Sequence, residues 1–207
     1  MTRMLIIGAP GSGKGTQAER ISKRFDVDAV STGDIFRANV NEMTPLGLRA
    51  KTFIEAGDLV PDSVTNEMIR DRLSRSDVEN GFLLDGYPRT AAQVDYLDGV
   101  LADGKQKLDI VLHLNADDEE LVSRMLARSS VSGRSDDKRA IISHRLKLYH
   151  EQTAAVIAKY AERNILTQVD GIGAIEVVTH RVLRAIKASL TNLGTPRPPK
   201  NGTAELM

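Results

Sequence analysis

The chain has 207 residues, no cysteine, and 28 basic against 28 acidic side chains. This length can bury a sizeable core without staples, and the lack of cysteine excludes a disulfide framework or a thiolate metal site. Balanced charge argues against an electrostatic nucleic-acid or membrane binder, and because we find neither a signal-peptide core nor a membrane-length apolar run, we expect a cytoplasmic globular protein.

Short apolar runs predict the strands of a buried sheet, at residues 4–8, 29–31, 82–84, 109–114 and 165–169. They lack polar alternation, which is typical of strands covered on both faces. Segments with helical periodicity lie between them. Strands that alternate with helices indicate an α/β fold with a parallel five-stranded sheet. We expect one domain over residues 1–190, with its core in residues 1–30, 61–126 and 138–190.

Two insertions interrupt this alternation. The first spans residues 31–60, where Thr44 and Pro45 are typical of a helix start and Gly57 of its end. The second spans residues 127–137. Its sequence is small, polar and basic without an apolar stripe, so we expect an exposed mobile loop. The tail at 191–207 is rich in Pro, Gly, Asn and Thr, and we expect it to be disordered.

A glycine-rich segment, Gly8–Thr16 (GAPGSGKGT), follows the first predicted strand and opens a helix. This spacing in this context predicts a phosphate-binding loop. Glycines let backbone N–H groups converge on an anion at a helix N-terminus, and Lys14 adds a full charge for the β and γ phosphates. The expected ATP contacts are Gly11, Ser12, Gly13, Lys14, Gly15 and Thr16. The alternative is a strand–helix turn with a surface lysine.

Gly15 stands directly after Lys14, where most such loops carry the Ser or Thr that binds magnesium. Thr16 comes one position later, so direct ligation of the metal by this hydroxyl is doubtful. This departure favours a nucleoside monophosphate kinase.

Asp85 ends an apolar strand, at the edge where open α/β sheets bind ligands. We expect it to hold Mg²⁺ through metal-bound water, since Mg²⁺ keeps several waters. The alternative for Asp85 is a helix-capping role. Asp34 could assist with the metal, and helix capping is an equal alternative for it. Asp136 and Asp137 stand at the end of the second insertion. They could anchor its hinge or pair with Arg134, and for Asp137 we favour capping of the long helix that follows.

Three segments in register resemble the adenylate kinases: GAPGSGKGTQ at 8–17, STGDIFR at 31–37, and GFLLDGYPRT at 81–90 with Gln93. The similarity spans residues 4 to about 187. The resemblance implies the P-loop kinase fold and transfer of a phosphoryl group from ATP to AMP, giving two ADP, with Mg²⁺ as cofactor.

The resemblance also assigns the insertions and the site residues. Residues 31–60 would bind AMP, and residues 127–137 would form a short lid over ATP, without structural zinc. The implied AMP contacts are Thr32, Arg37, Asp58, Leu59, Val60, Gly86, Arg89, Gln93, Arg134 and Arg145. Further implied ATP contacts are Arg124, Arg128 and Gly173. The implied catalytic set is Lys14, Asp85, Arg89, Arg134 and Arg145.

The arginines suit this chemistry. Two nucleotides repel each other through their phosphates, and the loose transition state spreads charge over the equatorial oxygens, so convergent cations are required. The guanidinium fork binds phosphate in bidentate fashion and stays protonated. For any single arginine, a solvated surface charge remains the alternative.

Two rival functions stay open at this stage. A UMP or CMP kinase would share most of these residues, although Thr32 and Gln93 favour AMP. A P-loop regulator that binds without transfer would not need Arg89, Arg134 and Arg145 together. No general base is needed, because the acceptor phosphate is already ionised. The four histidines carry no catalytic or metal signature. We expect a monomer, since no apolar seam is evident.

Overall fold

The computed structural model describes residues 2–132 and 135–193. Within them, parallel strands form a five-stranded sheet in the order β2-β3-β1-β4-β5. The strands are β1 Thr2–Ile7, β2 Asp28–Ser31, β3 Gly81–Asp85, β4 Ile110–Asn115 and β5 Leu166–Asp170. The predicted α/β fold and all five predicted strands are confirmed.

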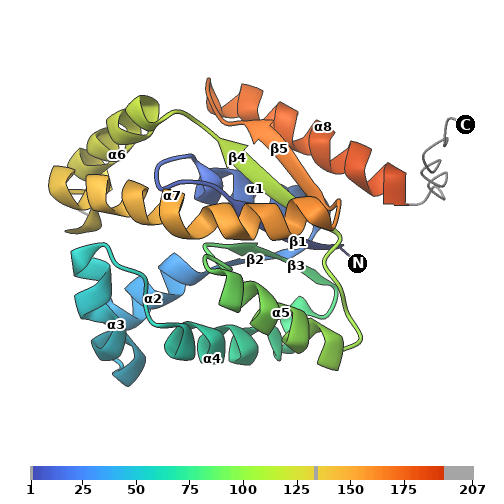
Figure 1. Ribbon diagram of the computed structural model, residues 1–207, viewed down its shortest axis with the longest axis horizontal. Coiled ribbons are helices and arrows are strands. Elements are labelled where there is room, and N and C mark those ends of the chain that lie inside the picture. Colours follow the sequence, from blue (N-terminus) through green and yellow to red (C-terminus); the bar gives the residue numbers. More distant parts are fainter. Residues whose placement is uncertain (1, 133–134, 194–207) are drawn as a thin grey trace, which may run out of the picture.

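Helices cover both faces of the sheet (Figure 1). They are α1 Lys14–Phe25, α2 Thr32–Asn41, α3 Pro45–Ala56, α4 Asp62–Leu73, α5 Ala91–Asp103, α6 Asp118–Ser132, α7 Arg139–Glu162 and α8 Ile175–Leu193. Short 3-10 turns, η1 Ser76–Val78 and η2 Ser135–Asp137, complete the described elements.

Neighbouring residues of each strand belong to opposite layers of the core, as the two-residue period of a strand requires. Met4 and Ile6 of β1 pack with apolar side chains of α1 and α8. Leu5 and Ile7 pack with those of α4, α5 and α7. Because both faces are covered, the central strands β1 and β3 are apolar except at their ends.

The first insertion contains the predicted helix, α3, and a second helix, α2, before it. Thr44 caps α3, since its hydroxyl accepts from the backbone N–H of Gly47 at 3.1 Å, and Pro45 is the first helical residue. Gly57 ends the helix with φ +80°. Helices α2 and α3 lie at the same end of the molecule as α6 and the start of α7 (Figure 1).

The expectation of an exposed loop at residues 127–137 is wrong for most of the segment. Helix α6 continues to Ser132, and η2 follows at Ser135–Asp137. Asp136 and Asp137 are buried. The sequence lacks an apolar stripe here because ion pairs, described below, replace apolar contacts. Gly133 and Arg134 lie outside the described residues.

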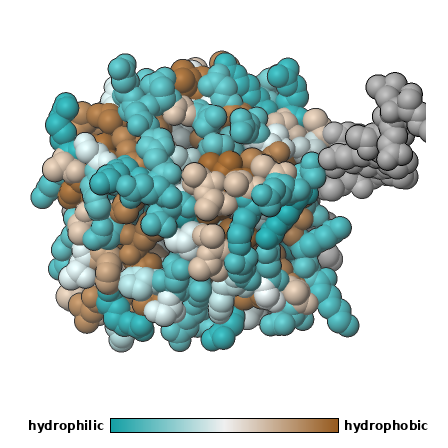
Figure 2. Space-filling model, in the orientation of Figure 1, coloured by the Kyte–Doolittle hydropathy of each residue, from teal (hydrophilic) through white to brown (hydrophobic). Residues whose placement is uncertain are grey.

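The predicted disordered tail begins too early, because α8 includes Thr191–Leu193; residues 194–207 lie outside the described residues. No helix in the described ranges is both long enough and apolar enough to cross a bilayer. On the face shown in Figure 2, apolar side chains form separate patches among polar ones.

Candidate functional site

A cleft of about 520 Å³ lies at the carboxyl edge of the sheet, where β1 and β3 end. The glycine-rich loop between β1 and α1 forms its floor. Its lining includes most of the residues predicted to bind ATP or catalyse transfer: Gly11, Ser12, Gly13, Lys14, Gly15, Thr16, Asp85, Arg89, Arg124, Arg128, Arg145 and Gly173. The fold therefore gathers side chains from distant parts of the sequence.

Glycine is required in the loop for two reasons. Gly11 and Gly13 have φ of +85° and +90°, a conformation that other residues rarely adopt. A Cβ on Gly8 would come within 2.6 Å of the Leu114 carbonyl oxygen, and one on Gly11 within 2.8 Å of that of Leu121. This curled backbone leads into the N-terminus of α1, where unpaired N–H groups and the helix dipole favour an anion.

The Lys14 ammonium group lies deep in the cleft. It donates to the carbonyl oxygens of Gly8 at 2.7 Å and Ala9 at 2.9 Å. Burial lowers its pKa to about 8; the nearby Asp85 carboxylate opposes this shift, and Arg89 and Arg145 add to it. The loop therefore holds a cation that is costly to bury and that an incoming phosphate would stabilise.

Asp85 is buried at the end of β3. Burial raises the pKa of its carboxyl group, and the charge of Lys14 acts in the opposite direction. A Cβ on Gly15 would lie 3.9 Å from Asp85 Oδ2, so the carboxylate faces the first turn of α1. Thr90 caps the helix after β3, since its hydroxyl accepts from the Gln93 backbone N–H. The capping alternative for Asp85 is therefore wrong.

The donor-side arginines of α6 both have partners within the protein. Arg124 Nε donates to Glu120 at 2.6 Å, and its NH1 to the Gly171 carbonyl oxygen at 3.0 Å. Arg128 forms a bidentate pair with Asp137, at 2.7 and 2.8 Å. Both side chains line the cleft. Both arginines therefore face the cleft, and contacts to protein groups hold each side chain in position.

The sequence favoured Asp137 as the cap of α7, and this prediction is wrong. Lys138 occupies the cap position, without a side-chain cap hydrogen bond. Asp137 is fully buried and binds Arg145 NH1 at 3.2 Å in addition to Arg128. Arg145 NH1 also lies 2.9 Å from Asp136 Oδ2. The acidic pair thus joins η2 to α6 and α7.

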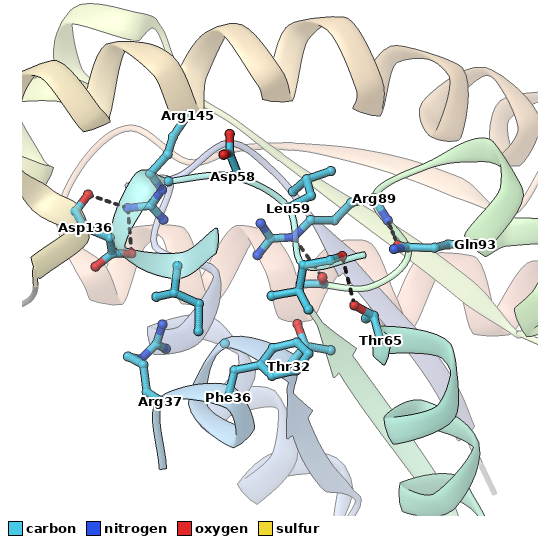
Figure 3. A pocket seen from close by; sticks show the side chains of 15 residues that line it. Thr32, Phe36, Arg37, Asp58, Leu59, Thr65, Arg89, Gln93, Asp136 and Arg145 are labelled. Atoms are coloured by element: carbon cyan, nitrogen blue, oxygen red, sulfur yellow. Dashed lines mark hydrogen bonds and ion pairs between the residues drawn. The ribbon is translucent and has the colours of Figure 1, made fainter. Parts of the chain in front are cut away.

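A second pocket adjoins the cleft and contains most of the residues predicted to contact AMP. Its lining includes Thr32, Phe36, Arg37, Ile54, Gly57, Asp58, Leu59, Val60, Thr65, Gly86, Arg89, Gln93, Asp136 and Arg145. Figure 3 shows Arg37, Arg89 and Arg145 entering it from three different elements. Arg37, Gly86, Arg89 and Arg145 line the cleft as well, so the two spaces meet at these residues.

Hydrogen bonds within the protein order the inner wall of this pocket. Thr32 is buried, and its hydroxyl donates to the Asp85 carbonyl oxygen at 3.3 Å. Arg89 Nε donates to the Gly86 carbonyl oxygen at 2.9 Å. Gly86 has φ +83°, and a Cβ there would lie 2.6 Å from Thr32 Oγ1. The pocket therefore requires glycine at this position.

At the pocket rim, Arg37 pairs with Asp34. Asp34 does not cap α2: Ser31 does, because its hydroxyl accepts from the Asp34 backbone N–H. Asp58 Oδ1 lies 2.6 Å from His144 Nε2 of α7. Arg134, the remaining predicted AMP and catalytic residue, lies outside the described residues.

A family model described as Adenylate kinase matches residues 6–165. The chain belongs to the adenylate kinase family. Relatives named adenylate kinase include those of Pseudarthrobacter chlorophenolicus, 72% identical over 91% of this chain and 98% of the relative, and Renibacterium salmoninarum, 64% identical over 90% and 96%. One from Nocardioides is 51% identical over 89% and 96%. The resemblance stated from the motifs is confirmed, and the enzyme is a phosphotransferase.

Sequence reasoning missed Asp62 and gave Asp137 another role. Asp62 of α4 contacts Gln93 and Thr90, and Asp137 holds two arginines of the kinase cleft. An acidic residue in the first turn of a helix is common, so Asp62 carried no distinctive signal. The pairing of Asp137 depends on α6 and α7 meeting, which no local pattern reveals.

His113, His144 and His150 make contacts within the protein. His113 Nε2 lies 2.9 Å from the Tyr149 hydroxyl, and burial, assisted by Lys14, lowers its pKa. His150 pairs with Asp118 on the surface. His180 lies on α8.

Proposed function

We propose that the enzyme transfers the γ-phosphoryl group of ATP to AMP, reversibly, giving two ADP. The observation that carries this proposal is the junction of the two spaces: Arg37, Gly86, Arg89 and Arg145 line both the phosphate-loop cleft and the adjoining pocket. A donor in the cleft and an acceptor in the pocket would meet there, phosphate to phosphate. A binding-only module has no need of this shared set.

On the donor side, the backbone N–H groups of the glycine loop and the N-terminus of α1 would bind the ATP phosphates, with Lys14 on the β and γ groups. Arg124 and Arg128 would face the nucleotide from α6, and the backbone at Gly173 would meet its base. Gly173 has φ +121° and lines the cleft, which supports a close backbone approach there.

On the acceptor side, Arg37 and Arg89 would bind the AMP phosphate, and Arg145 would bridge to the phosphoryl group in transit. Arg134 belongs to this proposal on the resemblance only. Thr32, the backbone at 58–60, Gly86 and Gln93 would surround the nucleoside. These groups position two anions and stabilise the charge of the transition state, which is most of what phosphoryl transfer requires. No general base is needed.

The site also fits Mg²⁺. Asp85 offers a buried oxygen donor beside the first turn of α1, next to where the phosphates would lie, and magnesium prefers oxygen ligands while keeping several waters. Asp85 would hold the ion through water. Bound magnesium would screen the repulsion between the phosphates.

Phosphorus NMR of the enzyme with Mg²⁺, ATP and AMP tests the proposal. We expect ADP to accumulate to equilibrium, and the Lys14→Ala variant to lose this conversion. Parallel reactions with CMP, UMP and GMP as acceptors should be much slower. ATP binding without ADP formation would contradict transfer, and a preference for UMP or CMP would contradict the acceptor assignment.

A further inference from the structure

The side-chain amide of Gln93 is held from both sides. Its Oε1 accepts from the backbone N–H of Arg89 at 2.7 Å, and its Nε2 donates to Asp62 Oδ1 at 2.7 Å (the contact to Arg89 is drawn in Figure 3). A backbone N–H can only donate and a carboxylate can only accept. The amide therefore has one orientation, although oxygen and nitrogen have almost the same shape.

Asp62 is itself held in place. Its Oδ2 accepts from the Thr90 hydroxyl at 3.1 Å, and the same hydroxyl accepts from the Gln93 backbone N–H at 3.1 Å. Asp62 is the first residue of α4, where the helix dipole favours a negative charge. The carboxylate thus links the start of α4 to the start of α5, and both of its oxygens have defined partners.

The amide of Gln93 keeps hydrogen-bonding capacity for a ligand. A glutamine amide has two N–H donors and two oxygen lone pairs, and the protein uses one of each. Gln93 is 2% exposed and lines the acceptor pocket, so the remaining donor and acceptor are kept from bulk water. With the orientation fixed, the positions of these two groups are fixed as well.

A base that fits such an amide must present a donor to Oε1 and an adjacent acceptor to Nε2. Adenine does so with its 6-amino group and a neighbouring ring nitrogen. A 6-oxo purine presents an oxygen where adenine has the amino group, so it would oppose oxygen to oxygen. The amide could accept the 6-oxo purine only by rotating through half a turn. Rotation would set its oxygen against the Asp62 carboxylate and its NH2 group against the Arg89 N–H.

We propose that Asp62 is a specificity-determining positioning residue: by fixing the Gln93 amide, it makes the acceptor site select a 6-amino purine monophosphate over a 6-oxo purine monophosphate. This inference rests on the proposed function, in which Gln93 faces the acceptor base. Asp62 acts through Gln93 and does not touch the nucleotide. Its effect falls on acceptor choice rather than on the phosphoryl-transfer step.

The Asp62→Asn variant tests this role with AMP and IMP, which differ at the 6-substituent and the adjacent ring nitrogen. Asparagine keeps the size and the contact to Thr90 but can also donate, so it removes one of the two contacts that oppose the rotated amide, while the Arg89 N–H remains. We expect the ratio of kcat/KM for AMP to that for IMP to fall about tenfold, the effect of relieving one buried unsatisfied group. The kcat with AMP should stay within about twofold of the wild type.

Asp71→Asn is the matched control, since Asp71 is an exposed residue of the same helix; it should leave the ratio unchanged. A ratio unchanged in Asp62→Asn, or an equal loss with both acceptors, would overturn the proposal. The wild type separates the two ideas: if it fails to phosphorylate AMP, the proposed function fails, whereas an active wild type with an unaffected variant rejects the inference.

A second measurement does not depend on the folding of the Asp62 variant. In the ¹H–¹⁵N spectrum of the wild type without nucleotide, the side-chain NH2 of Gln93 can be assigned by its loss in Gln93→Leu. We expect one of its protons to lie downfield and to exchange slowly, as a donor to a carboxylate. Two protons with the ordinary shifts and rapid exchange of a solvated glutamine side chain would show that the amide is not held.

Discussion

The part of the site proposed to bind phosphate and the part proposed to bind the acceptor base, called the phosphate-binding part and the base-binding part, are ordered by different kinds of contact. Each described cation predicted to bind phosphate already contacts a carboxylate or a carbonyl: Lys14 with Gly8 and Ala9, Arg37 with Asp34, Arg89 with Gly86, Arg124 with Glu120, Arg128 with Asp137, and Arg145 with Asp136. The base-binding part is ordered by the Thr32, Thr65 and Gln93 side chains, through neutral donors and one carboxylate.

The difference indicates how each part meets its ligand. Phosphate would displace or share the present partners of the cations, so binding there would exchange carboxylate and carbonyl contacts for contacts to phosphate. The amide and hydroxyl contacts of the base-binding part can persist when a base arrives, because they leave donors and acceptors unused. Substitutions in the first part should therefore alter affinity, rate and stability together, and those in the second should alter selectivity.

The largest expected effect is the loss of the Lys14 cation in the glycine-rich loop. Lys14→Ala should lower kcat about a thousandfold, because Lys14 contacts the β and γ phosphates in our proposal, and removing one preorganised electrostatic contact typically costs 10²–10³. A steady-state assay of ADP formation measures this. Lys23→Ala, an exposed residue of the same helix, is the control. Near-normal turnover in Lys14→Ala would show that the loop lysine is dispensable.

The next largest effect is expected at Asp137, which pairs with Arg128 and Arg145. Asp137→Asn should lower stability by about 2 kcal/mol, somewhat less than for a fully buried pair because Arg128 is 36% exposed. For a chain of this size that corresponds to about 4–8 °C in Tm. The KM for ATP should stay equal or fall, since Arg128 loses a competing anion.

Thermal unfolding and initial-rate kinetics on the same samples check this pair of outcomes. Asp77→Asn serves as the control, because Asp77 is half-exposed and neither it nor its partner Arg72 lines the cleft. If the KM for ATP rose in Asp137→Asn, the carboxylate would be positioning Arg128 for the nucleotide rather than competing with it.

The sequence predicts what is local. The strands, the glycine loop and the Thr44 cap could be predicted because each depends on neighbouring residues: an apolar run, a spacing of glycines, or a hydroxyl before a proline. The position of Asp85 followed from the strand that it ends. These features supply the fold and the donor side of the site.

The missed features depend on contacts between distant residues. Asp62 and Gln93 are 31 positions apart, and their hydrogen bond exists only because α4 and α5 begin side by side. Residues 127–137 were predicted to be a loop because they carry no apolar stripe, yet Asp137 makes ionic contacts with arginines on both sides of it in the chain. Propensity and periodicity do not contain such pairings, which tertiary packing creates.

The titration of Lys14 should change the affinity for ATP by about tenfold between pH 7 and pH 9. Its pKa of about 8 in the free enzyme means that ATP meets a mostly protonated lysine at pH 7 and a mostly neutral one at pH 9. Affinity should therefore fall as the pH rises through 8, with proton uptake on binding. Isothermal titration calorimetry in two buffers of different ionisation enthalpy measures both.

The same shift has a consequence of opposite sign for stability. The unfolded chain keeps the lysine proton up to about pH 10.5, so between pH 8 and 10.5 the unfolded state binds more protons than the folded one. The contribution of Lys14 to the free energy of unfolding thus rises with pH in that window. Lys14→Met should remove both pH effects; if the pH dependence of ATP affinity survived in this variant, another group would be responsible.

The smallest effect is expected at the rim of the acceptor pocket. Asp58 and His144 form a pair whose side chains are 46% and 42% exposed, and such surface pairs contribute about 0.5 kcal/mol or less. Asp58→Asn should change the urea midpoint little and the KM for AMP by less than about twofold, because our proposal assigns base contact to the backbone at 58–60. A double-mutant cycle with His144→Gln isolates the pair. A many-fold rise in KM for AMP would mean that a charged contact orders this segment, and the contrast between an ionic phosphate-binding part and a neutral base-binding part would no longer hold.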